Sequence, residues 1–248
     1  MPRTCCLPSA EQRTPHQEVA CSECGLDPIC QVLDYAEPGS GIPEGILIRR
    51  MPIPRGEMLL AYNQPFRAIY AVKSGSFKAM TWDLSSSERV VGFFLPGDLI
   101  GTDGLATDCY SYSVRALETS SVCRLEIEAL PKSGRSREAI QDALITLLGQ
   151  EVAMNHMVTT SLIQQNAEQR IAAFILSLAR RSGIRGLNRQ ELGLSMSRSD
   201  IASYLGLARE TVSRILTRFH NSNLIELRKH LLRVLDHGAL ERLSVLSE

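Results

Sequence analysis

The chain has 248 residues, of which 44% are hydrophobic, and its 27 basic and 27 acidic side chains give a net charge of zero. This length allows one large domain or two smaller ones, each able to bury a core. No stretch of about eighteen apolar residues occurs, which excludes a membrane-spanning helix. Residues 1 to 20 are polar and rich in proline, so we expect no secretory signal and a cytoplasmic protein without a membrane partner.

The charge is unevenly distributed along the chain. From Asn166 to the C-terminus, 13 Lys and Arg residues stand against 8 Asp and Glu residues, a net of +5, and the remainder therefore carries −5. A basic C-terminal part beside an acidic remainder favours a DNA-binding domain attached to a sensor domain. Because the excess is modest, we expect few phosphate contacts per subunit and a reliance on dimerisation for affinity.

Three cysteines lie close together near the N-terminus, as Cys21, Cys24 and Cys30. Cytosolic proteins rarely keep disulfides, so this spacing favours a metal site. Zinc is usually held by four thiolate or imidazole ligands, and a cubane iron–sulfur cluster by four thiolates. A fourth ligand must therefore come from elsewhere in the chain.

Four further cysteines are available for that position. Cys5 and Cys6 are adjacent and lie in a segment without packing signals, which makes them the weaker candidates. Cys109 lies in an expected turn and Cys123 at the edge of an expected strand. Spacing alone does not choose between these two.

A linker rich in Gly and Pro at residues 37 to 45 leads into a region of short apolar or alternating runs that extends to about Leu130. Several short strands separated by turns are typical of a β-sandwich or β-roll. The expected strands cover residues 46–48, 58–61, 68–72, 76–81, 90–95, 111–117 and 122–127.

A long helical pattern then begins near Ser136 and continues past Leu162. One stripe along it alternates spacings of three and four residues, which is typical of a coiled-coil seam. Because a two-fold DNA site requires two subunits, we expect this stripe to form a dimer interface, in which Asn155 weakens pairing while fixing its register. The alternative is a helix that packs only on its own domain. The stripe comprises Ile145, Leu148, Val152, Asn155, Thr159 and Leu162, and a second apolar face, expected to lie on the β-roll, comprises Leu144, Leu147, Met154 and Val158.

The C-terminal part begins with a capping-box pattern at Asn166 and Gln169, which opens a helix that Gly183 is expected to end. Two shorter helices follow, joined by the turn at Gly206. Residues 224–227 and 231–235, on either side of a basic turn, predict a two-stranded wing. This order of elements predicts a winged helix-turn-helix that binds double-stranded DNA. The second short helix should bury one face made of Val212, Ile215, Leu216 and Phe219.

The opposite face of that helix carries Arg209, Glu210, Ser213 and Arg214. A solvated surface helix would instead be expected to mix Lys with Glu four residues apart. Arg can bind guanine through two hydrogen bonds, and a carboxylate accepts a hydrogen bond from the amino group of cytosine. We therefore expect these four side chains to contact DNA.

At Tyr204-Leu-Gly-Leu207 and Arg209-Glu-Thr-Val-Ser-Arg214 the chain resembles the CRP/FNR superfamily of bacterial transcription regulators. The similarity runs from about Cys21 to Leu235. It points to the oxygen-responsive FNR branch, which carries a C-x2-C-x5-C motif near the N-terminus and one distant cysteine after an Ala-Leu-Glu-Thr stretch. Here that stretch is Ala116-Leu-Glu-Thr-Ser-Ser-Val-Cys123.

The resemblance implies a [4Fe-4S] cluster bound by Cys21, Cys24, Cys30 and Cys123. It also implies a homodimer while the cluster is intact and loss of DNA binding when oxygen converts the cluster. Such a protein is a transcription activator of anaerobic metabolism genes that works with RNA polymerase, and it is not an enzyme.

For DNA, the resemblance implies that Glu210, Ser213 and Arg214 contact palindromes of the type TTGAT-N4-ATCAA. Arg209 departs from the FNR pattern, in which an aliphatic residue is usual, and matches the branch that responds to cyclic AMP. We therefore expect Arg209 to let the protein accept G as well as T at the first specific position.

The predicted fold is α+β. It comprises an iron–sulfur ligand segment and linker over residues 1–45, a β-roll (a double-stranded β-helix of the cyclic-nucleotide-binding type) over 46–135, a dimerisation helix over 136–165 and a winged helix-turn-helix domain over 166–248. The alternative function is a regulator of the same fold that responds to a cyclic nucleotide, haem or zinc. Residues 101–105 read Gly-Thr-Asp-Gly-Leu in place of a Gly-Glu-Leu type turn, and residues 110–113 lack the arginine that would hold the phosphate of a cyclic nucleotide. A haem sensor would have no use for the cysteine triplet.

Overall fold

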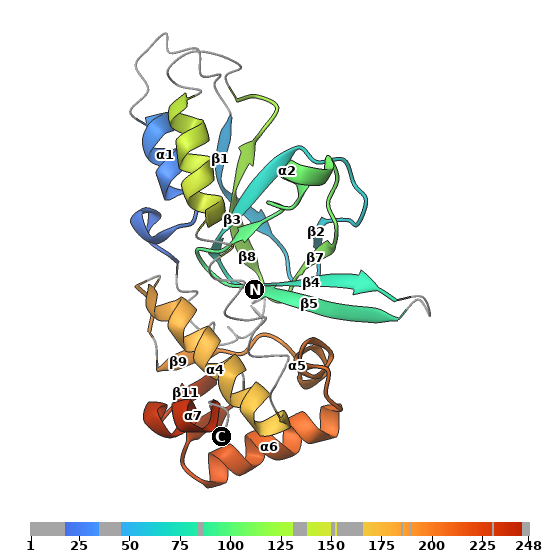
Figure 1. Cartoon of the computed structure of the whole chain (residues 1–248), viewed down its shortest axis with the longest axis vertical. Helices are drawn as coiled ribbons and strands as arrows, with labels where there is room; N and C mark the ends of the chain where they lie inside the picture. The colour runs from blue at the N-terminus through green and yellow to red at the C-terminus, as the bar shows by residue number, and fades with distance from the viewer. Residues whose placement is uncertain are drawn as a thin grey trace, which may run out of the picture.

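The structure is a computed structural model, and it describes residues 18–34, 46–83, 87–130, 138–149, 152, 166–184, 186–188, 190–229 and 231–244. A β-rich body lies above a mainly helical one along the longest axis (Figure 1). The expected linker at residues 37–45 lies outside the described residues, and so does the predicted long helix beyond residue 149 apart from Val152. No helix in the described part of the chain is long and apolar enough to cross a membrane.

Two antiparallel four-stranded sheets make up the upper body, which confirms the predicted β-roll. The first sheet has the order β1-β8-β3-β6, and the second has the order β2-β7-β4-β5. The strands of the first sheet are β1 (Leu47–Ile53), β8 (Ser120–Glu126), β3 (Ala68–Ser74) and β6 (Leu99–Ile100). Those of the second are β2 (Met58–Leu60), β7 (Ser113–Ala116), β4 (Phe77–Trp82) and β5 (Glu88–Phe94).

The first sheet holds two departures from the predicted strands. Strand β1 continues to Ile53 through Pro52, where the sequence predicted an end at Ile48. Pro52 is tolerated because β1 lies at the edge of its sheet, where a missing N–H need not break a ladder. Strand β6 has two residues, which is too short for any alternation of polar and apolar residues to be recognised.

Strand β3 is buried along its whole length because both faces of its sheet are covered. Successive side chains of a strand point to opposite faces. Tyr70 and Val72 therefore face the core between the two sheets, whereas Ile69 and Ala71 face outward. The outward face is covered by α1 (Asp27–Asp34) and by the helical residues 138–149, which lie side by side (Figure 1).

The helix at 138–149 packs on the roll through Ile140, Ala143 and Leu147, with Leu144 partly buried beside them. The predicted roll-facing side is thus confirmed for Leu144 and Leu147. Met154 and Val158 lie outside the described residues. Helix α1 was not predicted from the sequence, because eight residues are too few for a clear helical period.

The lower body begins with α4 (Ala167–Ile184), and its predicted capping box is confirmed. Asn166 Oδ1 accepts hydrogen bonds from the N–H groups of Glu168 and Gln169, at 3.0 and 3.1 Å, and Gln169 Oε1 accepts one from Asn166 N–H at 2.8 Å. The prediction that Gly183 ends this helix was wrong. Gly186 does so, since it takes the left-handed conformation with a φ of 67° and Leu187 N–H then bonds back to Ser182 O.

After α4 come β9 (Glu191–Gly193), α5 (Arg198–Leu205), α6 (Arg209–Asn221), β10 (Ile225–Arg228), β11 (Leu231–Val234) and α7 (His237–Ser244). The predicted two-stranded wing is confirmed, and β9 adds a third strand in the order β10-β11-β9. Strand β9 and helix α7, which packs against α4, were not predicted. The winged helix-turn-helix is therefore present, with one more strand and one more helix than expected.

Candidate DNA-binding face and cysteine segment

The turn between α5 and α6 has the local geometry that a helix-turn-helix requires. Ser197 caps α5 by accepting a hydrogen bond from Asp200 N–H at 3.1 Å, and Asp200 Oδ2 accepts from Ser197 N–H at 3.0 Å. The helix ends at Gly206, whose φ of 64° lies in the left-handed region that favours glycine. The chain can therefore reverse tightly enough to place α6 against α5.

Helix α6 buries the face predicted from the sequence and exposes the opposite one. Its four apolar residues are at most 2% exposed. Arg209, Glu210 and Arg214 are exposed and Ser213 is half-buried, on the helix at the lower end of the molecule (Figure 1). Ala208 at the N-cap offers no side-chain acceptor, so the first N–H groups of α6 are available to a DNA phosphate.

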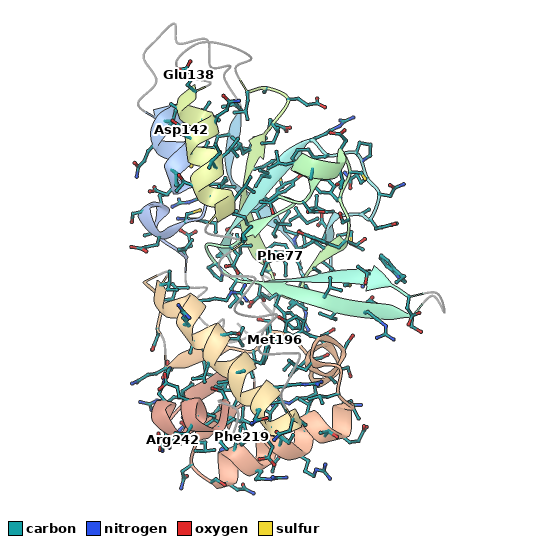
Figure 2. All side chains as sticks on the ribbon, in the orientation of Figure 1. Phe77, Glu138, Asp142, Met196, Phe219 and Arg242 are labelled. Carbon is teal, nitrogen blue, oxygen red and sulfur yellow. The ribbon has the colours of Figure 1, made fainter. Side chains whose placement is uncertain are left out.

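The apolar face of α6 joins a core that extends into the roll. Figure 2 places Phe219 within the lower body and Met196 near the junction with the upper one, and both belong to one hydrophobic cluster. That cluster also contains Val90 and Phe93 of β5. The ring of Phe93 lies 5.3 Å from that of Tyr204 and 6.0 Å from that of Phe174, measured between centroids. The roll and the DNA-binding part therefore share a core.

A polar contact accompanies this shared core. Lys78 Nζ on β4 lies 2.8 Å from a carboxylate oxygen of Asp200 and 2.7 Å from one of Glu88. Ser203 Oγ accepts a hydrogen bond from Val90 N–H at 3.0 Å. Sequence reasoning missed Lys78 and Asp200, because the two residues stand 122 positions apart and share no motif.

The contact between Lys78 and Asp200 shifts the pKa values of both side chains. Burial alone would raise the pKa of Asp200, but hydrogen bonds from Lys78 and Ser197 outweigh it and hold the pKa below its usual value. Burial alone would lower the pKa of Lys78, but its bonds to Asp200 and Glu88 outweigh it and raise the pKa. Both groups are therefore charged at neutral pH.

We predict that Asp200→Asn lowers the free energy of unfolding by about 2 kcal/mol at neutral pH, because Lys78 then loses one of its two carboxylate partners and keeps only Glu88. The folded-state pKa of Asp200 is depressed, so its stabilisation is present above the unfolded value of about 3.9 and is lost as the pH falls through the folded value. Urea unfolding at several pH values should show the difference between wild type and variant shrink below about pH 4. The exposed Asp142 (Figure 2) gives the control Asp142→Asn, and an Asp200→Asn difference that does not change with pH would contradict the assignment.

The cysteine segment, residues 18–34, lies on the outward face of the first sheet. Cys21 opens the short 3-10 helix η1 (Cys21–Glu23), Cys24 follows it, and Cys30 lies in α1. Cys123 lies in β8, opposite Ala71 of β3. Cys24, Cys30 and Cys123 all pack against the apolar cluster formed by Leu26, Ile29, Leu125 and their neighbours, whereas Cys109 pairs with Pro65 in an isolated bridge outside it.

Lys73 holds the start of the cysteine segment on β3. Its ammonium group, on a residue only 4% exposed, donates a hydrogen bond to the carbonyl of Val19 and lies 3.7 Å from Cys21 Sγ. Val19 N–H donates in return to Lys73 O at 3.0 Å. Sequence reasoning missed Lys73, although the alternation of Ile69, Ala71 and Lys73 along β3 puts all three on the face that receives the segment.

The donor set has the chemistry of an iron–sulfur site. Thiolates are the ligands of such clusters, and three of the four predicted ones border a single apolar cluster, with Cys21 beside Lys73. Within the described ranges, no group of three or more Cys, His, Asp or Glu side chains converges closely enough to hold a metal ion. The thiols are therefore ligands of the right kind for such a cluster, but among the described residues their side chains do not form one ligand shell.

The interior of the roll is filled where a cyclic nucleotide would be expected. The rings of Phe66 and Tyr110 meet edge to face at 5.6 Å, and Tyr110 OH donates to Ala68 O at 2.8 Å. A Cβ added at Gly101 would lie 2.8 Å from the Tyr110 ring. The most buried cation described, Lys73, points to the other face of β3, where it could not pair with a phosphate in the interior.

The predicted dimer stripe begins as an exposed apolar face. Ile145 is 69% exposed and Val152 is 54% exposed, while Leu148 is half-buried. Asn155, Thr159 and Leu162 lie outside the described residues. Ile145 and Val152 are therefore not covered by other parts of the same subunit that the structure describes.

Residues 50–132 match the family described as Cyclic nucleotide-binding domain, and residues 169–243 match Crp-like helix-turn-helix domain. The chain is 35% identical to Transcriptional activator protein anr of Pseudomonas aeruginosa, over 87% of this chain and 88% of the relative. It is 31% identical to Fumarate and nitrate reduction regulatory protein of Escherichia coli, over 91% and 90%. The solved structure of FixK2 from Bradyrhizobium japonicum shares the fold, with a TM-score of 0.70 at 23% identity over 80% of this chain and 98% of that one.

Proposed function

Because the chain belongs to the CRP/FNR superfamily of transcription regulators, we propose that it is an oxygen-responsive activator whose DNA binding requires a [4Fe-4S] cluster. The protein is a transcription regulator and not an enzyme. The proposed ligands are Cys21, Cys24, Cys30 and Cys123. One observation carries this assignment: Cys123 and the cysteine segment lie against the same apolar cluster although they are far apart in the sequence.

When bound, the cluster would supply an oxygen-sensitive cross-link between the cysteine segment and β8. Leu26 and Ile29 of the segment pack into the apolar core that also contains Ala143 and Leu147 of the helix at 138–149. Attachment of the segment would therefore stabilise the packing of the helix that carries the proposed dimer stripe. The stripe comprises Ile145, Leu148, Val152, Asn155, Thr159 and Leu162. Each change of about 1.4 kcal/mol in the free energy of dimerisation changes the monomer–dimer constant about tenfold.

Two copies would then present two α6 helices to a palindrome of the type TTGAT-N4-ATCAA. Arg214 is suited to guanine and Glu210 to cytosine, with Ser213 between them on the same face. Arg209 is exposed in the first turn and extends this face. RNA polymerase is the proposed protein partner, and the cytoplasm the proposed location. The proposed domains are residues 1–45, 46–135, 136–165 and 166–248, with the roles expected from the sequence.

The proposal is tested on protein purified without oxygen. We expect a broad visible absorption that bleaches in air, together with iron and sulfide at one cluster per subunit and a parallel loss of operator binding. A sharp Soret band would instead identify haem, and colourless protein would identify zinc or an empty site. Colourless protein that binds its operator at full strength would overturn the oxygen-sensing role.

A further prediction concerns the sequence that α6 reads. We expect Arg209→Val to weaken binding to GTGA-like half-sites by about tenfold or more, because one two-bond arginine–guanine contact contributes about 1–3 kcal/mol. Binding to TTGA-like half-sites should change little. Fluorescence anisotropy with both duplexes measures the two affinities, and Arg242→Val on α7 serves as a control for the loss of one positive charge. Equal weakening on both duplexes would mean that Arg209 contacts only phosphate.

A further inference from the structure

The turn between β5 and β6, residues 95–99, touches both the cysteine segment and the DNA-binding part. On one side Gly25, which follows Cys24, donates its N–H to Gly97 O at 2.9 Å. The approach is close, since a Cβ added at Gly25 would lie 2.8 Å from Gly97 O and 2.8 Å from Leu99 Cγ. Only glycine fits here unless the turn moves.

On the other side the turn is held by the last part of α4. Arg181 donates hydrogen bonds to the carboxylate of Asp98 and, at 2.7 Å, to the carbonyl of Phe93. The Asp98 side chain is 10% exposed and that of Arg181 17% exposed, so the pair is largely shielded from water. Because the pair is largely shielded, salt screens its attraction less than that of an exposed pair.

The turn itself is rigidly connected. Gly97 N–H donates to Val72 O at 2.7 Å, Val72 N–H donates to Asp98 O at 2.9 Å, and the Asp98 carboxylate accepts from Leu95 N–H at 2.6 Å. A shift of Gly97 therefore carries Asp98 with it.

A second contact joins the same two parts. A Cβ added at Gly186, just after α4, would lie 3.7 Å from Cγ of Glu23, so the Glu23 side chain lies beside the end of that helix. Helix α4 in turn packs on α6, and Glu168 near its start pairs with Arg218 of α6. A change in the tilt of α4 would therefore move α6 and the exposed face of α6 that is proposed to contact DNA.

We propose that Asp98 and Arg181 are positioning residues that pass the state of the cysteine segment to α4 and α6 within one subunit, separately from any change in dimerisation. This inference rests on the proposed oxygen-sensing function. The cysteine segment would then affect the orientation of the DNA-binding part as well as dimerisation.

Hydrogen–deuterium exchange of the full chain tests the inference, with wild type and Arg181→Met compared before and after exposure to air. In wild type we expect amide exchange to rise severalfold both in the turn and in residues 176–184 of α4. In Arg181→Met the turn should still respond while the α4 response falls severalfold, with the remainder passing through the contact of Glu23 with the end of α4. Arg181→Lys, which keeps a charged donor, should restore part of the α4 response. The control is Arg180→Met, which removes an exposed arginine one position earlier.

Gly25→Ala supplies a readout that does not depend on oxygen or on any bound group. The added methyl group should displace the turn, so exchange should rise in both regions of otherwise wild-type protein. When Arg181→Met is also present, exchange should rise fully in the turn and severalfold less in α4. An α4 response that is undiminished in either Arg181→Met experiment, or that is missing from wild type while the turn responds, overturns the inference. If air changes neither the absorption nor the turn, the oxygen-sensing function fails, and the Gly25→Ala comparison still decides whether Asp98 and Arg181 connect the two parts.

Discussion

Replacing Cys123 by serine should remove nearly all iron and sulfide from protein purified without oxygen, whereas Cys109→Ser should retain both. Cys123 borders the apolar cluster against which Cys24 and Cys30 pack, and Cys109 lies outside it. A serine oxygen is a poor substitute for a thiolate in an iron–sulfur site. Iron and acid-labile sulfide per subunit, together with the visible spectrum, measure the effect.

The same two variants test the link between the ligands and DNA binding. Cys123→Ser should bind its operator as weakly as air-exposed wild type, and Cys109→Ser should match the wild type without oxygen. Thermal unfolding of the air-exposed proteins controls for misfolding, because all three should then unfold alike. Loss of iron from Cys109→Ser alone would identify Cys109 as the fourth ligand. Retention of iron in both variants would mean that the fourth ligand is neither Cys109 nor Cys123.

Placing a carboxylate in the proposed dimer stripe should have the second large effect. We expect Ile145→Asp to raise the dimer dissociation constant by about a hundredfold or more, because association would bury two unpaired charges, one from each subunit. Ile145 is largely exposed within one subunit, so the substitution should leave the fold of the monomer intact. Sedimentation velocity without oxygen measures the constant, and circular dichroism checks the fold.

A matched control lies one residue along the same helix. Thr146 is also exposed but lies about 100° further round the helix, so Thr146→Asp adds the same charge away from the stripe. It should leave dimerisation nearly unchanged. Dissociation caused by Thr146→Asp and not by Ile145→Asp would place the interface on the other face of the helix.

Local periodicity and capping patterns predicted much of this fold. The buried face of α6, the two wing strands and the capping box at Asn166 were all recognisable, because each depends on residues only a few positions apart. The short elements β6, β9, α1 and α7 were missed because each lacks both a clear period and a recognised neighbouring motif. The equally short wing strands and α5 were found because they adjoin the helix-turn-helix pattern and its basic turn. The end of α4 was misplaced because two glycines compete there, and only the backbone shows that Gly186 takes the positive φ.

The sequence by itself determined which residue types are available: the thiols at Cys21, Cys24 and Cys30, and the polar face of α6. Only the tertiary structure decided which distant residues meet them. It brought Cys123 rather than Cys109 to the apolar cluster beside the segment, and it joined Lys78 to Asp200 and Asp98 to Arg181. The physical reason is that such contacts depend on strand register and on how the two bodies pack together, and neither leaves a short-range pattern in the chain.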